Sequence, residues 1–246
     1  MKFIAMPRYQ MRKNALKKLI KENAYNFRGG VFEIGYGAGE VFSLYRKLGL
    51  HVEGYDPSEE AYVYAGKNYG DSGVVLLREL PEEGRKYDYV VACEVLEHIE
   101  DDVKELKKWK KYLKNTGKMI VSVPAHQKRW GENDVYSGHY RRYEKKELME
   151  KFLAAGMRIE KIYTYDFPAC LLLDGMRDRS RGRKINRENL KKSREEFTKS
   201  SGIERDFGVV ARVLSHPALW YPVVKLEELF YRTDLGSAYI LMASLM

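Results

Sequence analysis

The sequence predicts an α/β fold, a three-layer sandwich in which helices cover both faces of a mostly parallel, doubly wound sheet. Two observations support this prediction. Apolar segments alternate with helical segments of about ten residues along residues 28–165, as they do in doubly wound sheets. The first apolar segment runs directly into a turn with glycine at residues 35, 37 and 39. Because ligands of such sheets bind where the strands end, the turn indicates a binding site at that edge.

The predicted strands are short runs rich in Val, Ile and Tyr, which favour extended structure. They cover residues 31–34, 51–55, 73–77, 87–93, 118–123, 157–165 and 237–245. The predicted helices have apolar residues at helical spacing or recognisable ends. They cover residues 8–26, 40–48, 58–69, 102–113 and 144–155.

Several helix ends have identifiable signals. Ser58 can accept a hydrogen bond from a backbone N–H of the first turn, and Glu59 and Glu60 follow where the helix dipole favours acids. Gly49 and Gly156 follow two predicted helices, since glycine readily adopts the left-handed conformation that ends a helix. These signals agree with the alternation of strands and helices.

The chain of 246 residues is long enough for one α/β domain. We predict four parts: a basic N-terminal helix (1–28), a core (29–166), a helical insertion on the substrate side (167–232) and a returning edge strand (233–246). The insertion is too short and too charged for a core of its own. Its aromatic residues could line an acceptor pocket or cover the sheet; they are Phe207, Trp220, Tyr221, Phe230 and Tyr231.

The net charge of +9 is unevenly distributed along the chain. Residues 1–28 carry +7 and residues 177–205 carry +6, so the remainder is net acidic. These basic segments could be solvated helical surfaces. Alternatively, they could face an anionic partner, namely a phosphorylated substrate, nucleic acid or an anionic membrane surface.

Cysteine usage and hydropathy exclude several classes of protein. Cys93 and Cys170 have neither disulfide nor metal-ligand spacing. No apolar run reaches the ~18 residues of a membrane span, so we expect no integral membrane segment. We also expect no N-terminal leader and a cytoplasmic location. The sequence does not indicate an oligomeric state.

The glycine turn differs from the dinucleotide fingerprint Gly-x-Gly-x-x-Gly, because its third glycine comes one residue too early. Glycine there permits positive φ and a close approach of a ligand to the backbone. Asp56 ends the second predicted strand, 17 residues after Gly39. A carboxylate at this place can accept hydrogen bonds from both ribose hydroxyls of an adenosine; the alternative is an acid that only begins a helix.

Two motifs together resemble those of class I S-adenosylmethionine (SAM)-dependent methyltransferases. The first is Glu33-x-Gly35-x-Gly37-x-Gly39, and the second is the run Glu-Val-Leu-Glu-His at residues 94–98. The second run resembles the signature of the ubiquinone-biosynthesis O-methyltransferase-like branch. The resemblance implies a Rossmann-like, seven-stranded sheet with an antiparallel last strand, and SAM as cofactor. In this family the glycines approach the methionine part of SAM, the acid before them orders the loop, and the acid after strand two holds the ribose. By this resemblance the cofactor-binding residues are Glu33, Gly35, Gly37, Gly39, Asp56 and Glu94.

The resemblance also implies a reaction, in which an acceptor attacks the sulfonium methyl group in line. Positioning and desolvation supply most of the rate of such a step. A base is needed only for a weakly acidic hydroxyl, and His98 and His139 are our candidates; each could instead be structural. We expect methylation of oxygen on a small, anionic or lipid-linked acceptor. A non-catalytic SAM-binding protein is the less favoured alternative.

A second enzymatic interpretation is a metal-assisted RNA methyltransferase. In the small-RNA 3′-end methyltransferases, a Glu-x-x-Glu-His run and a later His bind a divalent metal, and Glu94, Glu97, His98 and His139 match those positions. The run could equally begin a helix without metal. The sequence has no Asn-Pro-Pro-Tyr run, which would indicate methylation of a nucleobase amino group. It also has no cysteine where the nucleophile for C5 methylation of a pyrimidine would be expected.

Two further resemblances concern basic side chains. The segment Gly-His-x-Arg-Arg-Tyr at residues 138–143 resembles an element of many methyltransferases of this branch, so Arg141, Arg142 and Tyr143 could hold an anionic substrate or fix their own loop. Arg12, near Tyr9, could bind the carboxylate of SAM, because related chains have an aromatic–Arg pair there; the alternative is a solvated arginine.

Overall fold

The computed structural model describes residues 7–23, 29–175 and 217–246. Their strands form one seven-stranded sheet in the order β3-β2-β1-β4-β5-β7-β6. The strands are β1 (Gly30–Ile34), β2 (His51–Tyr55), β3 (Val74–Leu77), β4 (Tyr87–Cys93), β5 (Leu113–Pro124), β6 (Met157–Tyr165) and β7 (Ala238–Leu245). The helices of six residues or more are α1 (Pro7–Asn23), α2 (Phe42–Lys47), α3 (Glu59–Tyr69), α4 (Asp102–Trp109), α5 (Glu132–Ser137), α6 (Lys145–Ala154) and α10 (Pro217–Glu227).

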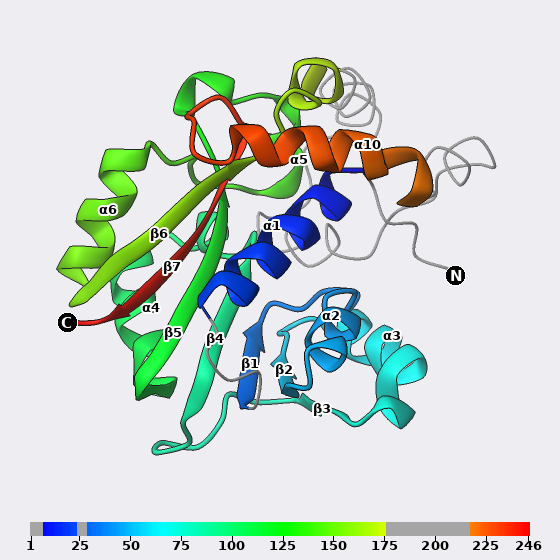
Figure 1. The fold of residues 1–246 in the computed structure, drawn as a ribbon. Helices are drawn as coiled ribbons and strands as arrows, with labels where there is room; N and C mark the ends of the chain where they lie inside the picture. Colours follow the sequence, from blue (N-terminus) through cyan, green and yellow to red (C-terminus); the bar gives the residue numbers. More distant parts are fainter. Residues whose placement is uncertain (1–6, 24–28, 176–216) are drawn as a thin grey trace.

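Helices cover both faces of the sheet, which confirms the predicted three-layer α/β architecture (Figure 1). On one face α1, α2, α3 and α10 pack in a cluster that includes Leu16, Phe42 and Val224. On the other face α4 and α6 pack through Leu106 and Phe152. Successive side chains of a strand point to opposite faces, so the strands contribute to both clusters.

The last strand is antiparallel, as predicted, but it is not an edge strand. β7 lies between β5 and β6 and pairs antiparallel with both, so the prediction of a returning edge strand at 233–246 was wrong. Residues 238–243 are almost fully buried, and their continuous apolar run, Ala-Tyr-Ile-Leu-Met-Ala, is typical of a strand covered on both faces rather than of an edge. β6 is the edge strand at this end of the sheet, and β3 is the edge strand at the other end.

One helix–strand boundary also differs from the sequence prediction. The helix predicted over 102–113 ends at Trp109 and continues as the 3₁₀ turn Lys110–Tyr112. β5 then begins at Leu113, five residues earlier than predicted, because the segment Asn115–Gly117 is extended and not a helix end. The pairing register with β4 shifts there, from Tyr87↔Leu113 to Tyr89↔Lys118.

The predicted insertion, 167–232, is only partly described. Residues 170–175 are helical, and α10 closes the segment. The basic segment 177–205 and Phe207 lie outside the described residues. No helix in the described ranges is long and apolar enough to cross a bilayer.

The buried position of β7 predicts a large packing cost. Leu241 is fully buried. The variant Leu241→Ala should lower the free energy of unfolding by about 2–5 kcal/mol, because the side chain's transfer free energy is lost and a cavity remains. Leu153→Ala on α6, where the side chain is 58% exposed, should stay within about 0.5 kcal/mol. Denaturant unfolding of both variants is the measurement, and equal losses would contradict the buried placement of β7.

Candidate active site

The glycine turn lies between β1 and α2 at the carboxyl end of the sheet. Gly35, Gly37 and Gly39 have φ of 70°, 53° and 70°, a region that glycine adopts at little cost. A Cβ on Gly35 would come within 2.4 Å of Val95 Cγ2, so the turn packs directly against the segment after β4. The first and second sequence motifs therefore meet in space.

Asp56 holds this turn in place. Its Oδ2 accepts the N–H of Gly37 at 2.8 Å, and its Oδ1 accepts the N–H of Ser58 at 2.9 Å. Ser58 in turn caps α3, accepting a hydrogen bond from the N–H of Ala61. Burial raises the pKa of Asp56, although both backbone hydrogen bonds oppose that shift. Each carboxylate oxygen has a further lone pair, so the group can still accept hydrogen bonds from a ligand.

Glu33, on β1, lies buried under the same region. Its Oε2 has no hydrogen-bond partner. The hydrogen bond to the N–H of Gly37 in the glycine turn is accepted by Asp56 and not by Glu33. Burial raises the pKa of Glu33 to about 8, despite the nearby Arg12. Glu33 is therefore largely protonated at neutral pH.

Arg12 reaches this edge from α1. Its guanidinium carbon lies 5.0 Å from the centre of the Tyr9 ring, in the range of a cation–π contact. Its Nε is buried without a hydrogen-bond partner. A buried N–H group without an acceptor is costly, so this group is ready to donate to an anionic ligand.

Glu94, directly after β4, is held in an ionised form. Its φ is 57°; its Oε1 accepts hydrogen bonds from the hydroxyls of Tyr165 (2.9 Å) and Ser122 (3.2 Å). Its Oε2 lies 3.8 Å from Arg8 Nη2. Burial alone would raise its pKa, but the guanidinium groups of Arg8 and Arg12 outweigh burial, and the pKa falls to about 2.

Arg8 connects α1 to three strand ends. Besides Glu94, its Nε lies 3.2 Å from Asp166 Oδ2 at the end of β6, and its Nη2 donates to the carbonyl of Ser237 before β7. Ser237 Oγ donates to the same Asp166 oxygen at 2.7 Å. These contacts fix the helix across the carboxyl edge of the sheet.

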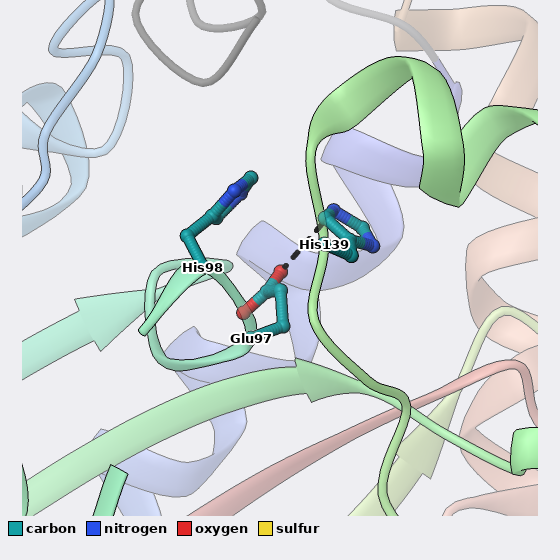
Figure 2. A group of neighbouring side chains, drawn as sticks. All are labelled: Glu97, His98 and His139. Atoms are coloured by element: carbon teal, nitrogen blue, oxygen red, sulfur yellow. Dashed lines mark ion pairs between the residues drawn. The ribbon is translucent and has the colours of Figure 1, made fainter. Parts of the chain in front are cut away.

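Glu97, His98 and His139 form a second group (Figure 2). Ligand atoms of the three residues lie within 4.8 Å of one another. Glu97 Oε1 is 3.9 Å from His139 Nε2, and the rings of His98 and His139 meet edge to face at 4.7 Å. The structure thus brings together both predicted histidines, one from the turn after β4 and one from the loop between α5 and α6.

The electrostatics of this group are unusual. Glu97 is fully buried, and neither carboxyl oxygen has a hydrogen-bond partner. Burial and the charge of Glu94 raise the pKa of Glu97 well above its ordinary value. Burial and the neighbouring His139 lower the pKa of His98 to about 3, so its imidazole is neutral. A buried carboxyl beside two imidazoles is a donor set suited to a proton or a divalent cation.

Asp134, on α5, orients His139, and the sequence analysis did not single it out. Its Oδ1 lies 2.8 Å from His139 Nδ1, and it also accepts hydrogen bonds from Arg142 and from the N–H of Gly131. With the Nδ1 proton donated to Asp134, the His139 Nε2 lone pair faces Glu97. Burial would raise the pKa of Asp134, but the contacts with His139 and Arg142 lower it. No local signal marks this pairing, since only the fold of the loop sets it.

The Gly-His-x-Arg-Arg-Tyr segment is used by the scaffold. Arg141 donates to Asp102 at 2.6 Å, and Tyr143 donates to the same oxygen at 3.1 Å. Arg142 is paired with Asp134. These three side chains therefore fix the loop that holds His139.

His126, which follows β5, has a different neighbourhood. Its Nδ1 lies 3.3 Å from Glu144 Oε2, and its ring contacts Tyr239 edge to face at 5.6 Å between centroids. It is not part of the group formed by Glu97, His98 and His139.

Comparison with known proteins identifies the family of this chain. The family model described as "Methyltransferase domain" matches residues 8–162, more than half of the chain. The ubiquinone biosynthesis O-methyltransferase of Bradyrhizobium diazoefficiens is 34% identical over 106 residues, 40% of this chain and 42% of that protein. The chain thus matches about two fifths of the length of this curated relative.

Solved structures share the fold at low sequence identity. An S-adenosylmethionine-dependent methyltransferase from Clostridium acetobutylicum has a TM-score of 0.57 and 11% identity, covering 96% of this chain and 92% of that chain. The [4+2]-cyclase SpnF has a TM-score of 0.59 and 15% identity, covering 94% and 81%. Because a cyclase shares the architecture, the fold alone does not fix a reaction.

The depressed pKa of Glu94 predicts a pH-dependent contribution to stability. A carboxylate whose pKa falls on folding stabilises the protein above its ordinary pKa of 4.5 and loses this effect as pH falls toward 2. Glu94→Gln should therefore lower the unfolding free energy at pH 7 by about 1–3 kcal/mol, and this difference should shrink between about pH 5 and about pH 2. Urea unfolding across that range is the measurement. The exposed Glu100→Gln is the matched control, and a difference that does not change with pH would contradict the assignment.

Proposed function

The chain belongs to the family whose model is described as a methyltransferase domain. From this premise we propose that it is a SAM-dependent methyltransferase and that it methylates an oxygen atom of a small acceptor beside Glu97, His98 and His139. One observation carries this proposal. The buried Glu97 carboxyl, without a hydrogen-bond partner, faces the Nε2 side of an imidazole that Asp134 orients. Such a group can take up a proton or a cation at the place where an acceptor hydroxyl must be activated.

The residues at the carboxyl edge fit the cofactor that the family implies. Asp56 would accept hydrogen bonds from the ribose hydroxyls with its remaining lone pairs, and the glycine turn leaves its backbone accessible to the methionine part. The buried Nε of Arg12 would donate to the cofactor carboxylate. SAM supplies a methyl group already activated on a sulfonium. The role of the chain is to position the cofactor and the acceptor and to exclude water.

His139 is the proton acceptor of the proposed reaction. Asp134 accepts its Nδ1–H, which leaves the Nε2 lone pair on the side of the group where the acceptor would bind. The carboxylate also stabilises the imidazolium that forms when His139 takes a proton. His98 has a pKa of about 3, too low for a general base near neutral pH, and its neutral ring instead presents a lone pair.

In a second form of the proposal a divalent cation binds the same three side chains, and His139 is then a ligand of the cation and not the base. Glu97, His98 and His139 would hold it, and the Asp134–His139 hydrogen bond is the kind of outer contact that orients a metal-bound imidazole. A cation there would lower the pKa of a bound hydroxyl. The Glu97 oxygens favour this form of the proposal, because neither of them has a hydrogen-bond partner among the described residues.

The proposed acceptor is a small, hydroxyl-bearing molecule of the lipid-linked kind. Support comes from the curated relatives, whose names refer to ubiquinone biosynthesis. An RNA acceptor depends on the basic segment 177–205, which lies outside the described residues. The acceptor screen that separates these two classes is methyl transfer from labelled SAM to lipid, small-molecule and RNA fractions.

The cofactor assignment predicts weaker SAM binding when Asp56 is replaced. Asp56→Ala should raise the SAM dissociation constant about 10- to 100-fold, since two hydrogen bonds to a charged group are lost. Isothermal titration with SAM and with S-adenosylhomocysteine is the measurement. Asp71→Ala, at an exposed acid in the turn after α3, is the control. Unchanged affinity in folded Asp56→Ala would remove Asp56 from the cofactor site.

The cation assignment predicts metal binding that depends on His139. Chelator-stripped protein should bind Mn²⁺ in calorimetry, and His139→Ala should bind it at least about tenfold more weakly. The exposed His51→Ala is the control. Absence of heat with the unmodified protein, together with methyl transfer that survives EDTA, would remove the cation and leave His139 as a base alone.

A further inference from the structure

A stripe of lysines runs along α1, away from the site. Lys13, Lys17 and Lys21 are four residues apart, so they project from one side of the helix. With Lys47 of α2 they line a surface hollow of about 410 Å³ between α1, α2 and α10. No acidic side chain is among the described residues that line this hollow. Four cations without an acid in one hollow repel one another and attract an anionic surface.

The helix beside this hollow, α10, exposes several apolar side chains. Val224 and Glu227 are buried against the rest of the protein. Several outward-facing residues are apolar, namely Leu219 (55% exposed), Tyr221 (62%), Leu226 (46%) and, in the following turn, Leu229 (75%), and the exposed Lys225 lies among them. Several large apolar side chains exposed on one helix indicate an interaction site.

The lysines of the hollow and the exposed apolar side chains belong to neighbouring helices. Tyr221 and Val224 of α10 line the same hollow as Lys17 and Lys21, and α1 and α10 lie side by side (Figure 1). We call this the α1–α10 surface; its members are Lys13, Lys17, Lys21, Lys47, Leu219, Tyr221, Leu226 and Leu229.

Its chemistry distinguishes two anionic partners. Single-stranded nucleic acid is held by basic grooves with aromatic rings that stack on bases, but here one exposed tyrosine stands among three leucines. Leucines beside lysines instead suit the boundary between head groups and acyl chains, where the apolar side chains enter and the lysines attract anionic lipids. We propose that the α1–α10 surface docks the protein onto an anionic lipid bilayer.

This docking does not depend on methyl transfer, so it is tested by itself. The full-length protein is sedimented with vesicles of phosphatidylglycerol and phosphatidylcholine in equal parts, and with pure phosphatidylcholine vesicles. Binding is expected only to the anionic vesicles. It should weaken when ionic strength rises from about 0.1 M to about 1 M, because the screening length falls from about 10 Å to about 3 Å. Equal binding to both vesicles would overturn the proposal.

Paired variants separate the two parts of the surface. Lys17→Glu with Lys21→Glu should lower partitioning at least about tenfold, and Leu226→Ser with Leu229→Ser should lower it several-fold. The controls lie on α4 and α6, on the opposite face of the sheet: Lys107→Glu with Lys146→Glu, and Met149→Ser with Leu153→Ser. Both control pairs should keep the binding and the SAM affinity of the unmodified protein.

Two results would overturn the proposal. One is a loss of vesicle binding in the control pairs equal to that in the test pairs. The other is tight binding of single-stranded polyuridylate that the lysine pair abolishes and the leucine pair leaves intact, without binding to vesicles. That pattern would identify a nucleic acid as the partner of the lysine hollow.

Discussion

The ionised carboxylate of Glu94 is the interaction on which the carboxyl edge of this sheet depends. It lies where β4 ends, and Tyr165 of β6 and Ser122 of β5 donate hydrogen bonds to it. Arg8, which faces it from α1, also contacts Asp166 and the carbonyl of Ser237. Charges removed from water must be paired to be tolerated. This pairing therefore fixes the N-terminal helix and four strand ends in one arrangement.

The negative charge of Glu94 also raises the pKa of Glu97, three residues further along the chain. Glu94 and Glu97 belong to one short run, yet the pKa of the first falls to about 2 while that of the second is raised well above its ordinary value. The cause is that Arg8 and Arg12 stabilise the charged form of Glu94, whereas Glu97 is buried beside it without a hydrogen-bond partner. Environments that separate the pKa values of two neighbouring carboxyl groups in this way are typical of sites where the two acids have different roles. Here one acid supports the scaffold, and the other remains available to a proton or cation.

The loop that holds His139 buries two carboxylates, and this explains the two arginines in the segment 138–143. Asp134 and Asp102 are both buried acids, and Arg142 and Arg141 neutralise them. Without these arginines, Asp102 would retain Lys151 and Tyr143 and Asp134 would retain His139 and the N–H of Gly131, but each carboxylate would lose its guanidinium partner. The arginines that could have held a substrate are thus occupied in keeping one imidazole in place.

The sequence by itself determined the α/β architecture of this protein and indicated the edge of the sheet at which the candidate site lies. Strand and helix periods, the cap at Ser58 and the glycine spacing are local properties, and local sterics and hydrogen bonding decide them. Tertiary structure alone decided the rest: that β7 is inserted between β5 and β6, that Asp134 orients His139, and that Arg8 pairs with Glu94. The first and the last join residues far apart in sequence, whereas the fold of one loop brings together Asp134 and His139, which are five residues apart. Burial, which no local pattern reports, gives each its energy. The glycine turn could be recognised from its spacing, but which acid is ionised beside it depends on the charges that the fold brings within reach.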